Sequence, residues 1–88
     1  MEKQWVLYIL CCRDGTLYTG ITDNLIRRLE QHRNGKGAKY TRGRGPLQVV
    51  YLEQCQNHSV ALRREIAIKR LSRKEKLNLC STFTEKAL

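Results

Sequence analysis

The chain has 88 residues and a formal net charge of +9. A chain of this length makes one domain, expected over residues 1–88 with its core at about 5–80 and a tail at 81–88. A neutral substrate does not call for so large a charge, whereas a polyanion does. The longest apolar run is far too short to span a bilayer, and no basic start precedes a long apolar stretch. We therefore expect a cytoplasmic protein that makes no membrane contact.

The cysteine pattern argues against disulfides and against a zinc site. Cys11 and Cys12 are neighbours in an apolar run, while Cys55 and Cys80 stand apart from them. No Cys-x-x-Cys sequence or histidine pair supplies the spacing of zinc ligands. Buried free thiols in a reducing compartment are the expected state.

Residues 5–12 and 16–22 predict the two strands of a β-hairpin. The first run is almost continuously apolar and aromatic, as in a strand buried on both faces. The second run is rich in β-branched and aromatic residues, and Asp14-Gly15 between the two supplies a turn. The chain is therefore expected to open with a pair of antiparallel strands.

The length of this turn decides where Tyr8 and Tyr18 point. A two-residue turn places the phenols on opposite faces, because a one-residue slip flips every side chain. A three-residue loop at 13–15, with Gly15 left-handed, pairs Tyr8 with Gly20 and puts both phenols on one face. Taken alone, tyrosines are ordinary strand residues. Glycine weakens a strand, so Gly20 indicates a bulge or a place where a ligand approaches the backbone.

A helix is predicted from an N-cap at Asp23 through about His32, ended by Asn34-Gly35. Arg28 and His32 are one turn apart and border the apolar side of this helix. Arg28 could equally be a solvated surface arginine, and His32 could be a C-terminal histidine that interacts with the helix dipole. The predicted apolar stripe consists of Leu25, Leu29 and partly Ile26.

Residues 35–46 predict a mobile, glycine-rich loop. Its cations and one aromatic ring, without an acid, suit the tracking of phosphates better than generic solubility. The residues expected to bind nucleic acid are Lys36, Lys39, Tyr40, Arg42 and Arg44. Residues 47–52 return to apolar and β-branched types and predict a third strand.

Two further helices are predicted after the third strand. Ser59 is the expected cap of the first, and Ser72-Arg73-Lys74-Glu75 is a capping box for the second. The tail after Thr82 gives no firm signal. The residues expected to face inward are Ala61, Leu62, Ile66, Ile68, Leu77 and Cys80.

Glu65 is the most informative single residue of these helices. It lies one turn from Ala61 and faces the margin of the core, where carboxylates are rare without a partner. An ion pair with Lys69 or with Arg28 would explain it. A metal site would also explain it, because Mg²⁺ needs only one or two carboxylates when phosphate supplies the other ligands.

Two short motifs resemble those of the GIY-YIG nuclease family, and the likeness covers roughly residues 5 to 80. The first motif reads Val6-Leu7-Tyr8, with valine where the family name has glycine and with the functional tyrosine in place. The second reads Tyr18-Thr19-Gly20, which keeps the tyrosine and the glycine around a variable middle.

Three downstream residues extend the resemblance. Arg28 matches the family's arginine, and His32 matches a histidine that other members replace by tyrosine. Glu65 matches the metal-binding glutamate. The segments 35–42 and 62–65 look like those of small single-domain bacterial members.

The resemblance implies an α/β (α+β) fold, with a small three-stranded antiparallel sheet flanked by about three helices. It also implies hydrolysis of DNA phosphodiester bonds with Mg²⁺ or Mn²⁺, in repair or recombination. In that scheme Arg28 stabilises charge on the phosphate and Glu65 holds the metal. Tyr8, Tyr18 or His32 takes the proton of the attacking water, and which of them does so stays open. A free tyrosine would need its pKa lowered by about two or three units for this role.

Two other classes of function compete with the nuclease. One is a non-catalytic module that binds DNA or RNA on the same fold, and the other is a structural subunit of a larger assembly. The enzyme is favoured because the set of polar residues is intact, namely Tyr8, Tyr18, Arg28, His32 and Glu65. A mere binder has no use for Glu65 beside its own phosphate ligand. DNA is expected as the partner in preference to RNA. Larger family members attach a separate DNA-binding domain, so here a protein partner could supply specificity.

Overall fold

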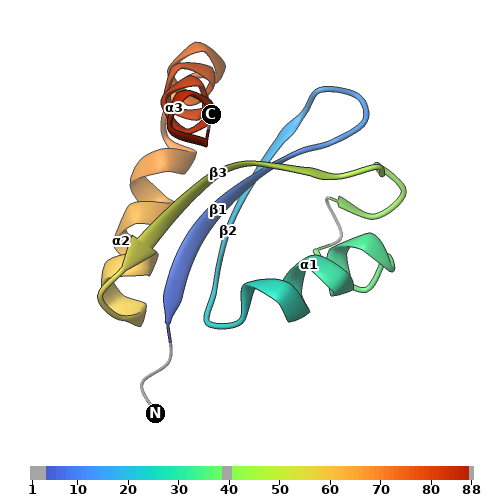
Figure 1. Ribbon diagram of the computed structural model, residues 1–88, viewed down its shortest axis with the longest axis horizontal. Coiled ribbons are helices and arrows are strands. Elements are labelled where there is room, and N and C mark those ends of the chain that lie inside the picture. Colours follow the sequence, from blue (N-terminus) through green and yellow to red (C-terminus); the bar gives the residue numbers. More distant parts are fainter. Residues whose placement is uncertain (1–3, 39–40, 88) are drawn as a thin grey trace.

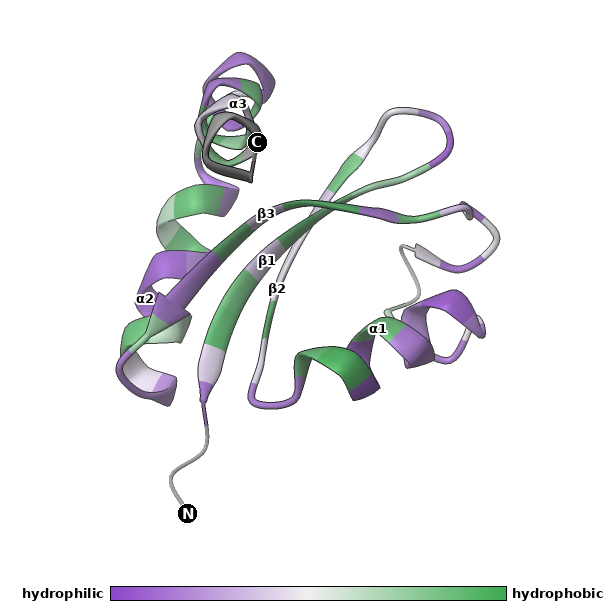
Figure 2. Cartoon of the chain, in the orientation of Figure 1, coloured by the Kyte–Doolittle hydropathy of each residue, from purple (hydrophilic) through white to green (hydrophobic). Residues whose placement is uncertain are grey.

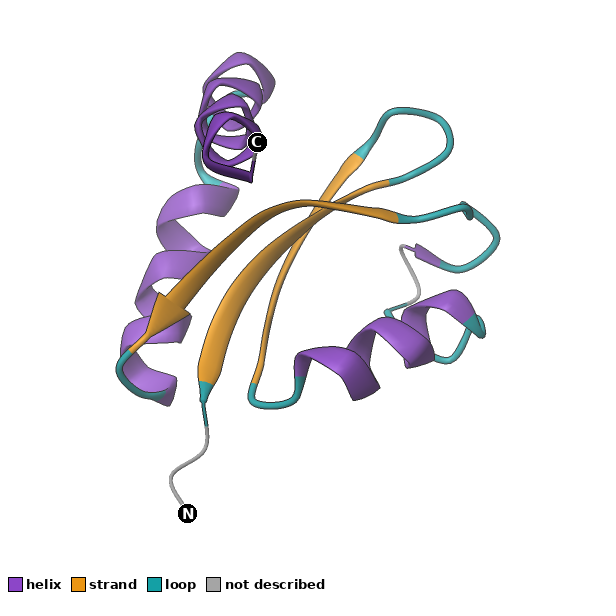
Figure 3. Cartoon of the chain, viewed as in Figure 1, coloured by secondary structure: helices purple, strands orange, loops and turns teal. Residues whose placement is uncertain are grey.

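The computed structural model describes residues 4–38 and 41–87, with side chains through residue 83. Within these ranges the chain forms a three-stranded antiparallel sheet of order β2-β1-β3 and three helices, as predicted (Figures 1 and 3). The elements are β1 (Trp5–Cys11), β2 (Leu17–Thr22), α1 (Leu25–Arg33), β3 (Gln48–Cys55), α2 (His58–Lys69) and α3 (Arg73–Ala87).

The hairpin between β1 and β2 has the three-residue loop. Tyr8 lies opposite Gly20 and Leu10 lies opposite Tyr18, so the two tyrosines share one face of the sheet. Gly15 has φ +85°, the left-handed conformation that this loop requires. The longer of the two turns considered from the sequence is therefore correct.

The two faces of the sheet are covered by different helices. Figure 1 shows α1 on one side of the strands and α2 with α3 on the other. Figure 2 shows that β1, the central strand, is the most continuously hydrophobic element. Its alternate residues Leu7 and Ile9 are fully buried and belong to the core on the α2 side. Burying each of these two side chains stabilises the fold by roughly 2 kcal/mol. The rest of that core consists of Cys55, Ala61, Ile68 and Cys80.

Two of the predicted helix caps are wrong by one or two residues. The N-cap of α1 is Asn24, whose side chain accepts a hydrogen bond from the Arg27 backbone N–H at 3.2 Å, and not Asp23. The N-cap of α2 is Asn57, which accepts from the Val60 N–H at 2.9 Å, and not Ser59. In both helices an asparagine, which is also a favoured N-cap residue, lies within two residues of the predicted cap and makes the hydrogen bond instead.

The capping box and the end of α1 lie where the sequence predicts them, whereas β3 and α3 end later. Glu75 and Ser72 exchange the two hydrogen bonds of the capping box, at 2.9 and 3.2 Å. Asn34 caps the end of α1, with Gly35 at φ +73° beyond it. The third strand extends three residues past the predicted end, to Cys55, and α3 continues to Ala87 where the sequence gave no signal.

Several apolar residues expected to face inward are exposed. Ile26 is 74% exposed and Ile66 is 51% exposed, and Leu62 and Leu77 are also on the surface. A sheet of three strands covers only a narrow stripe of each helix, so apolar residues at the border of that stripe stay in water. Ala61, Ile68 and Cys80 are buried as predicted.

All four cysteines are free, as expected from their spacing. None of the helices in the described ranges combines the length and the apolar character needed to cross a membrane.

Candidate active site

Tyr8, Tyr18 and His32 meet on the α1 side of the sheet. Tyr8 from β1 is fully buried, and its hydroxyl lies 2.9 Å from Nε2 of His32 on α1. The Tyr18 ring, from β2, is 6.3 Å from the Tyr8 ring and 5.4 Å from the imidazole, measured between centroids. Three different elements therefore bring two phenols and one imidazole into a single cluster.

The protonation state of His32 follows from its hydrogen bonds. The imidazole is only 2% exposed, and its Nδ1 lies 2.8 Å from the hydroxyl oxygen of Thr41. That hydroxyl donates its one proton to the carbonyl oxygen of Ala38 at 3.0 Å, because a carbonyl can only accept. Nδ1 must then carry a proton and donate to Thr41, which leaves Nε2 to accept from the Tyr8 hydroxyl.

Burial and the neighbouring charges reinforce this arrangement. Burial lowers the pKa of His32, and the positive charge of Arg28 lowers it further, so the imidazole is neutral. Burial raises the pKa of Tyr8, and the hydrogen bond with Arg28 opposes that rise only in part. The Tyr8 phenol is consequently harder to ionise than free tyrosine, whereas a tyrosine base acting alone would need its pKa lowered.

Arg28 is half-buried and lies next to both tyrosines. Its hydrogen bond with Tyr8 is the main influence that raises the pKa of the guanidinium, with a further contribution from Tyr18. It also donates to the Gln31 side chain at 3.1 Å. A fixed cation beside the phenols suits the binding of a phosphate.

Glu65 on α2 lies within electrostatic range of the cluster. Its side chain is 18% exposed and forms an ion pair with Lys69 at 3.4 Å, which is the first of the two pairings considered from the sequence. Its negative charge contributes to the raised pKa of Tyr8, which places the carboxylate within electrostatic range of that phenol.

The donor set suits one kind of metal site. Among the described residues, no three His, Cys, Asp or Glu side chains gather closely enough to hold a metal ion between them. Glu65 would therefore be the protein ligand of a hydrated Mg²⁺ or Mn²⁺, with water and substrate phosphate completing the coordination shell. Such a site fits the residues present.

Two glycines are needed for the cluster to pack. A Cβ atom built on Gly20 would lie 2.5 Å from the Tyr8 hydroxyl oxygen, so this glycine makes room for the phenol. The close approach expected at Gly20 is thus made by Tyr8. A Cβ on Gly37 would lie 2.5 Å from Nδ1 of His32 and 2.9 Å from its Cα. The segment after α1 is therefore packed directly against the imidazole.

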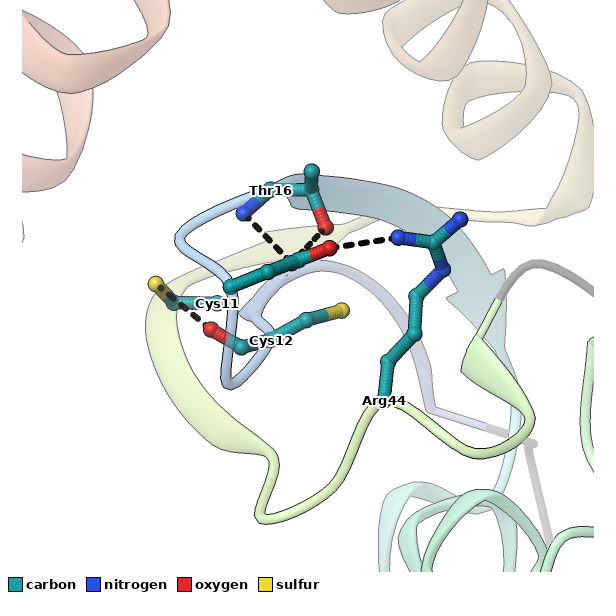
Figure 4. A network of polar contacts seen from close by, with 5 residues as sticks. Cys11, Cys12, Thr16 and Arg44 are labelled. Carbon is teal, nitrogen blue, oxygen red and sulfur yellow. Dashed lines mark hydrogen bonds and ion pairs between the residues drawn. The ribbon is translucent and has the colours of Figure 1, made fainter.

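The cations of the loop after α1 are partly engaged in structural contacts. Figure 4 shows Arg44 reaching toward the hairpin turn that carries Thr16. There it forms an ion pair with Asp14, and the Asp14 carboxylate also accepts from the Thr16 hydroxyl at 2.6 Å. Nε of Arg42 donates to the Gly35 carbonyl at 3.2 Å. Lys36 is exposed, whereas Lys39 and Tyr40 lie outside the described residues.

A hollow of about 500 Å³ separates this loop from the end of α1. His32, Thr41 and Pro46 are among the residues that line it. The buried imidazole therefore borders a space next to the basic segment.

Sequence reasoning missed Thr41 and Gly37. Both lie in the segment 35–42 that resembles small members of the family, but their contacts with His32 depend on how the loop folds back over α1. The adjacent small residues Gly37 and Ala38 were the available signal, because close packing on a ring requires residues without bulk.

A model of the GIY-YIG catalytic domain matches residues 4–78, a range that includes the whole cluster. The chain belongs to the GIY-YIG family. It is 56% identical over 79 residues to a UPF0213 protein of Oceanobacillus iheyensis, covering 90% of this chain and 92% of that one. It is 54% identical over 76 residues to a UPF0213 protein of Clostridium perfringens, covering 86% and 82%.

Two solution NMR structures resemble the fold. A UPF0213 protein from Bacillus halodurans is 46% identical and superposes with a TM-score of 0.60, covering 90% of this chain and 84% of that chain. A protein from E. faecalis is 39% identical with a TM-score of 0.66, covering 94% and 88%. Relatives of known structure thus share both the sequence and the architecture.

Proposed function

We propose that this protein is a metal-dependent endonuclease that hydrolyses phosphodiester bonds of DNA. One observation carries the proposal: the Tyr8 hydroxyl lies between a neutral imidazole acceptor, 2.9 Å away, and the guanidinium of Arg28. An ordinary core tyrosine needs one hydrogen-bond partner. A phenol flanked by both a base and a phosphate-binding cation is arranged for proton transfer beside an anion.

The hydrogen bond from Tyr8 to Nε2, together with the raised pKa of Tyr8, supports His32 as the final proton acceptor. As the attacking water loses a proton to the Tyr8 oxygen, the phenol passes its own proton to Nε2 of His32. The water oxygen forms a bond to phosphorus, and the bond from phosphorus to the leaving oxygen breaks with its electron pair on that oxygen. His32, then a cation, returns its proton to solvent through Tyr8. In this scheme Tyr8 relays the proton and His32 is the base.

The other residues hold charge. Arg28 binds a non-bridging oxygen of the phosphate and stabilises the negative charge that develops there. Glu65 would hold the divalent cation through its carboxylate. The chemistry that a bound Mg²⁺ or Mn²⁺ supplies at Glu65 is Lewis-acid stabilisation of charge on the phosphate and on the leaving oxygen.

The ion pair of Glu65 with Lys69 favours a second candidate, a nucleic-acid-binding module without catalysis. In that function Glu65 only anchors Lys69 in a basic surface. The buried relay from Ala38 through Thr41 and His32 to Tyr8 has no purpose in a simple binder. We therefore place the nuclease first.

The test is incubation of the purified protein with duplex, single-stranded and branched DNA and with RNA. Each substrate is tested with Mg²⁺, with Mn²⁺ and with a chelator. Cleavage of at least one DNA that stops with chelator supports the enzyme, and preference for branched substrates would support a role in repair or recombination. Binding without cleavage of any substrate, with either metal, would favour the module instead. A protein partner that supplies specificity would then be sought by adding cell extract.

A further inference from the structure

The outer edge of the sheet carries a groove that the candidate active site does not use. β2 is an edge strand, α2 packs against it, and the first turn of α3 comes close to its start. A hollow of about 330 Å³ is lined by Leu17, Tyr18, Thr19, Lys69 and Lys76. A second hollow of about 170 Å³ is lined by Thr16, Leu17, Arg73 and Lys76. Because the two share Leu17 and Lys76, they form one groove, which we call the β2 groove.

The charged side chains that line the β2 groove are all cations, one of which, Lys69, is ion-paired with Glu65 beyond the lining. Lys69, Lys76 and Arg73 contribute three cations, and within the described part of the chain no acidic side chain lines either hollow. Lys76 is half-buried. Three cations along a groove of this kind attract a chain of phosphates more strongly than a single anion.

A buried hydroxyl supplies an independent observation. Thr19 is only 4% exposed, and its hydroxyl oxygen has no hydrogen-bond partner among residues 4–38 and 41–87. A buried polar group without a partner destabilises a fold, so such groups are rare and call for a functional explanation. Thr19 lines the same hollow as Lys69 and Lys76, and its buried hydroxyl would donate to a phosphate oxygen bound there once the hydroxyl turns toward the hollow.

The β2 groove and the active-site cluster adjoin at two residues. Tyr18 lines the groove and also packs edge-on against His32. Lys69 lines the groove and pairs with Glu65, the candidate metal ligand. A strand of nucleic acid with its scissile phosphate at Arg28 would therefore have neighbouring phosphates within reach of the groove.

We propose that the β2 groove binds the phosphodiester backbone of the nucleic-acid strand on one side of the scissile bond. This inference rests on the proposed function and gives the substrate a path through the site. Phosphates on the other side would meet the described residues of the loop after α1, 35–38 and 41–46. The protein would then hold the strand at both sides of the cluster, without reading its sequence.

The first test measures how DNA binding depends on salt, in chelator so that cleavage does not interfere. The double variant Lys69→Gln/Lys76→Gln removes two cations from the groove. The matched control Arg63→Gln/Lys74→Gln removes two cations from exposed positions on the same helices, outside both linings. The slope of log affinity against log salt should fall by about 1.4–1.8 in the groove variant. In the control it should change by less than half as much. An equal change in both variants, or none in the groove variant, would overturn the proposal.

A second variant guards against a fold disturbed by the loss of the Lys69 ion pair. Thr19→Val keeps the shape of the side chain and removes only the hydroxyl. Because that hydroxyl has no partner in the free protein, the melting temperature should stay the same or rise. Affinity for DNA should fall roughly tenfold, as expected for the loss of a hydrogen bond to a charged group. Unchanged affinity would count against the groove. A fall in affinity together with a lower melting temperature would also count against it, because loss of fold would then explain the weaker binding.

Failure of the groove and failure of the nuclease give different results. Binding is measured in chelator, so it does not depend on catalysis. If the parent protein cuts DNA and the salt dependence of binding is unchanged in the groove variant, only the groove proposal fails. If the parent never cuts and the salt dependence of binding falls in the groove variant, only the nuclease proposal fails.

Discussion

The Tyr8 hydroxyl donates to Nε2 of His32 across 2.9 Å, and this hydrogen bond ties the central strand of the sheet to α1. Both side chains are almost completely buried. The same contact therefore contributes to the fold and sets the direction in which a proton moves. Its dependence on a neutral imidazole makes it sensitive to pH.

Acid should destabilise the fold through His32. Its pKa is lowered from 6.5 by burial, so the folded state disfavours the proton that the unfolded chain binds as the pH falls through about 6.5. The stability is fully present above that pH and is lost progressively as the pH drops toward the folded pKa. The melting temperature should fall between pH 7.5 and 5.5 in the parent and fall less in His32→Gln. If the melting temperature falls equally in the parent and in His32→Gln, His32 is not the cause of the acid destabilisation.

Thr41→Val should impair catalysis by releasing the imidazole. Without the hydroxyl, Nδ1 loses its acceptor and Nε2 is no longer held as the acceptor from Tyr8. Cleavage should fall at least about tenfold, as for other partners that orient a functional imidazole. Thr41→Ser keeps the hydroxyl and should retain most of the activity. Nitrogen NMR of His32 should show the proton on Nδ1 in the parent and in the serine variant, but a changed tautomer in the valine variant.

Gly20→Ala and Gly37→Ala should each disturb the cluster. The new methyl group would press on the Tyr8 phenol in the first and on both the ring and the Cα of His32 in the second. Overpacking of this kind destabilises by about 1–3 kcal/mol. Gly45→Ala is the matched control, because a Cβ there meets nothing within 4 Å. Equal melting temperatures for all three variants would show that the close contacts at Gly20 and Gly37 do not require glycine.

Glu53→Gln should lower stability and leave cleavage per folded molecule unchanged. Arg64 on α2 binds the Glu53 carboxylate through two nitrogens, at 2.6 and 2.9 Å, and Tyr51 donates to it at 2.7 Å. These contacts hold α2 against β3, away from the cluster. Because both charged groups are partly exposed and screened, the loss should be about 1 kcal/mol. A thermal melt should then shift by roughly 4–8 °C. A change in the cleavage rate at constant folded fraction would mean that this pair also acts in the site.

The parts of the fold that the sequence predicted are those fixed by local rules. The hairpin followed from its strand pattern and turn residues, but its register stayed open between two loop lengths until the structure showed the three-residue loop with Gly15 left-handed and both tyrosines on one face. The capping box at Ser72 needed only its own four residues. The N-caps were predicted at Asp23 and Ser59, although Asn24 and Asn57 make the bonds, because all four side chains are able to cap a helix. Only the path of the backbone distinguishes them.

The parts of the site that escaped prediction depend on contacts between distant segments. Thr41 follows His32 by nine residues, and nothing local indicates that its hydroxyl returns to the imidazole. The rise in the pKa of Tyr8 depends on burial by several elements at once. The unpartnered hydroxyl of Thr19 likewise becomes visible only when the strand edge and the later helices are in place.

The measurement that bears most directly on the proposed function is the cleavage of DNA by Glu65→Gln, compared with the parent in Mg²⁺ and in Mn²⁺. Glutamine keeps the shape of the side chain, so the melting temperature should stay close to that of the parent. Divalent-dependent cleavage should be abolished, while binding in chelator should persist or tighten because one negative charge near the phosphate is gone. A stable variant that cuts as well as the parent would contradict the metal-binding role of Glu65.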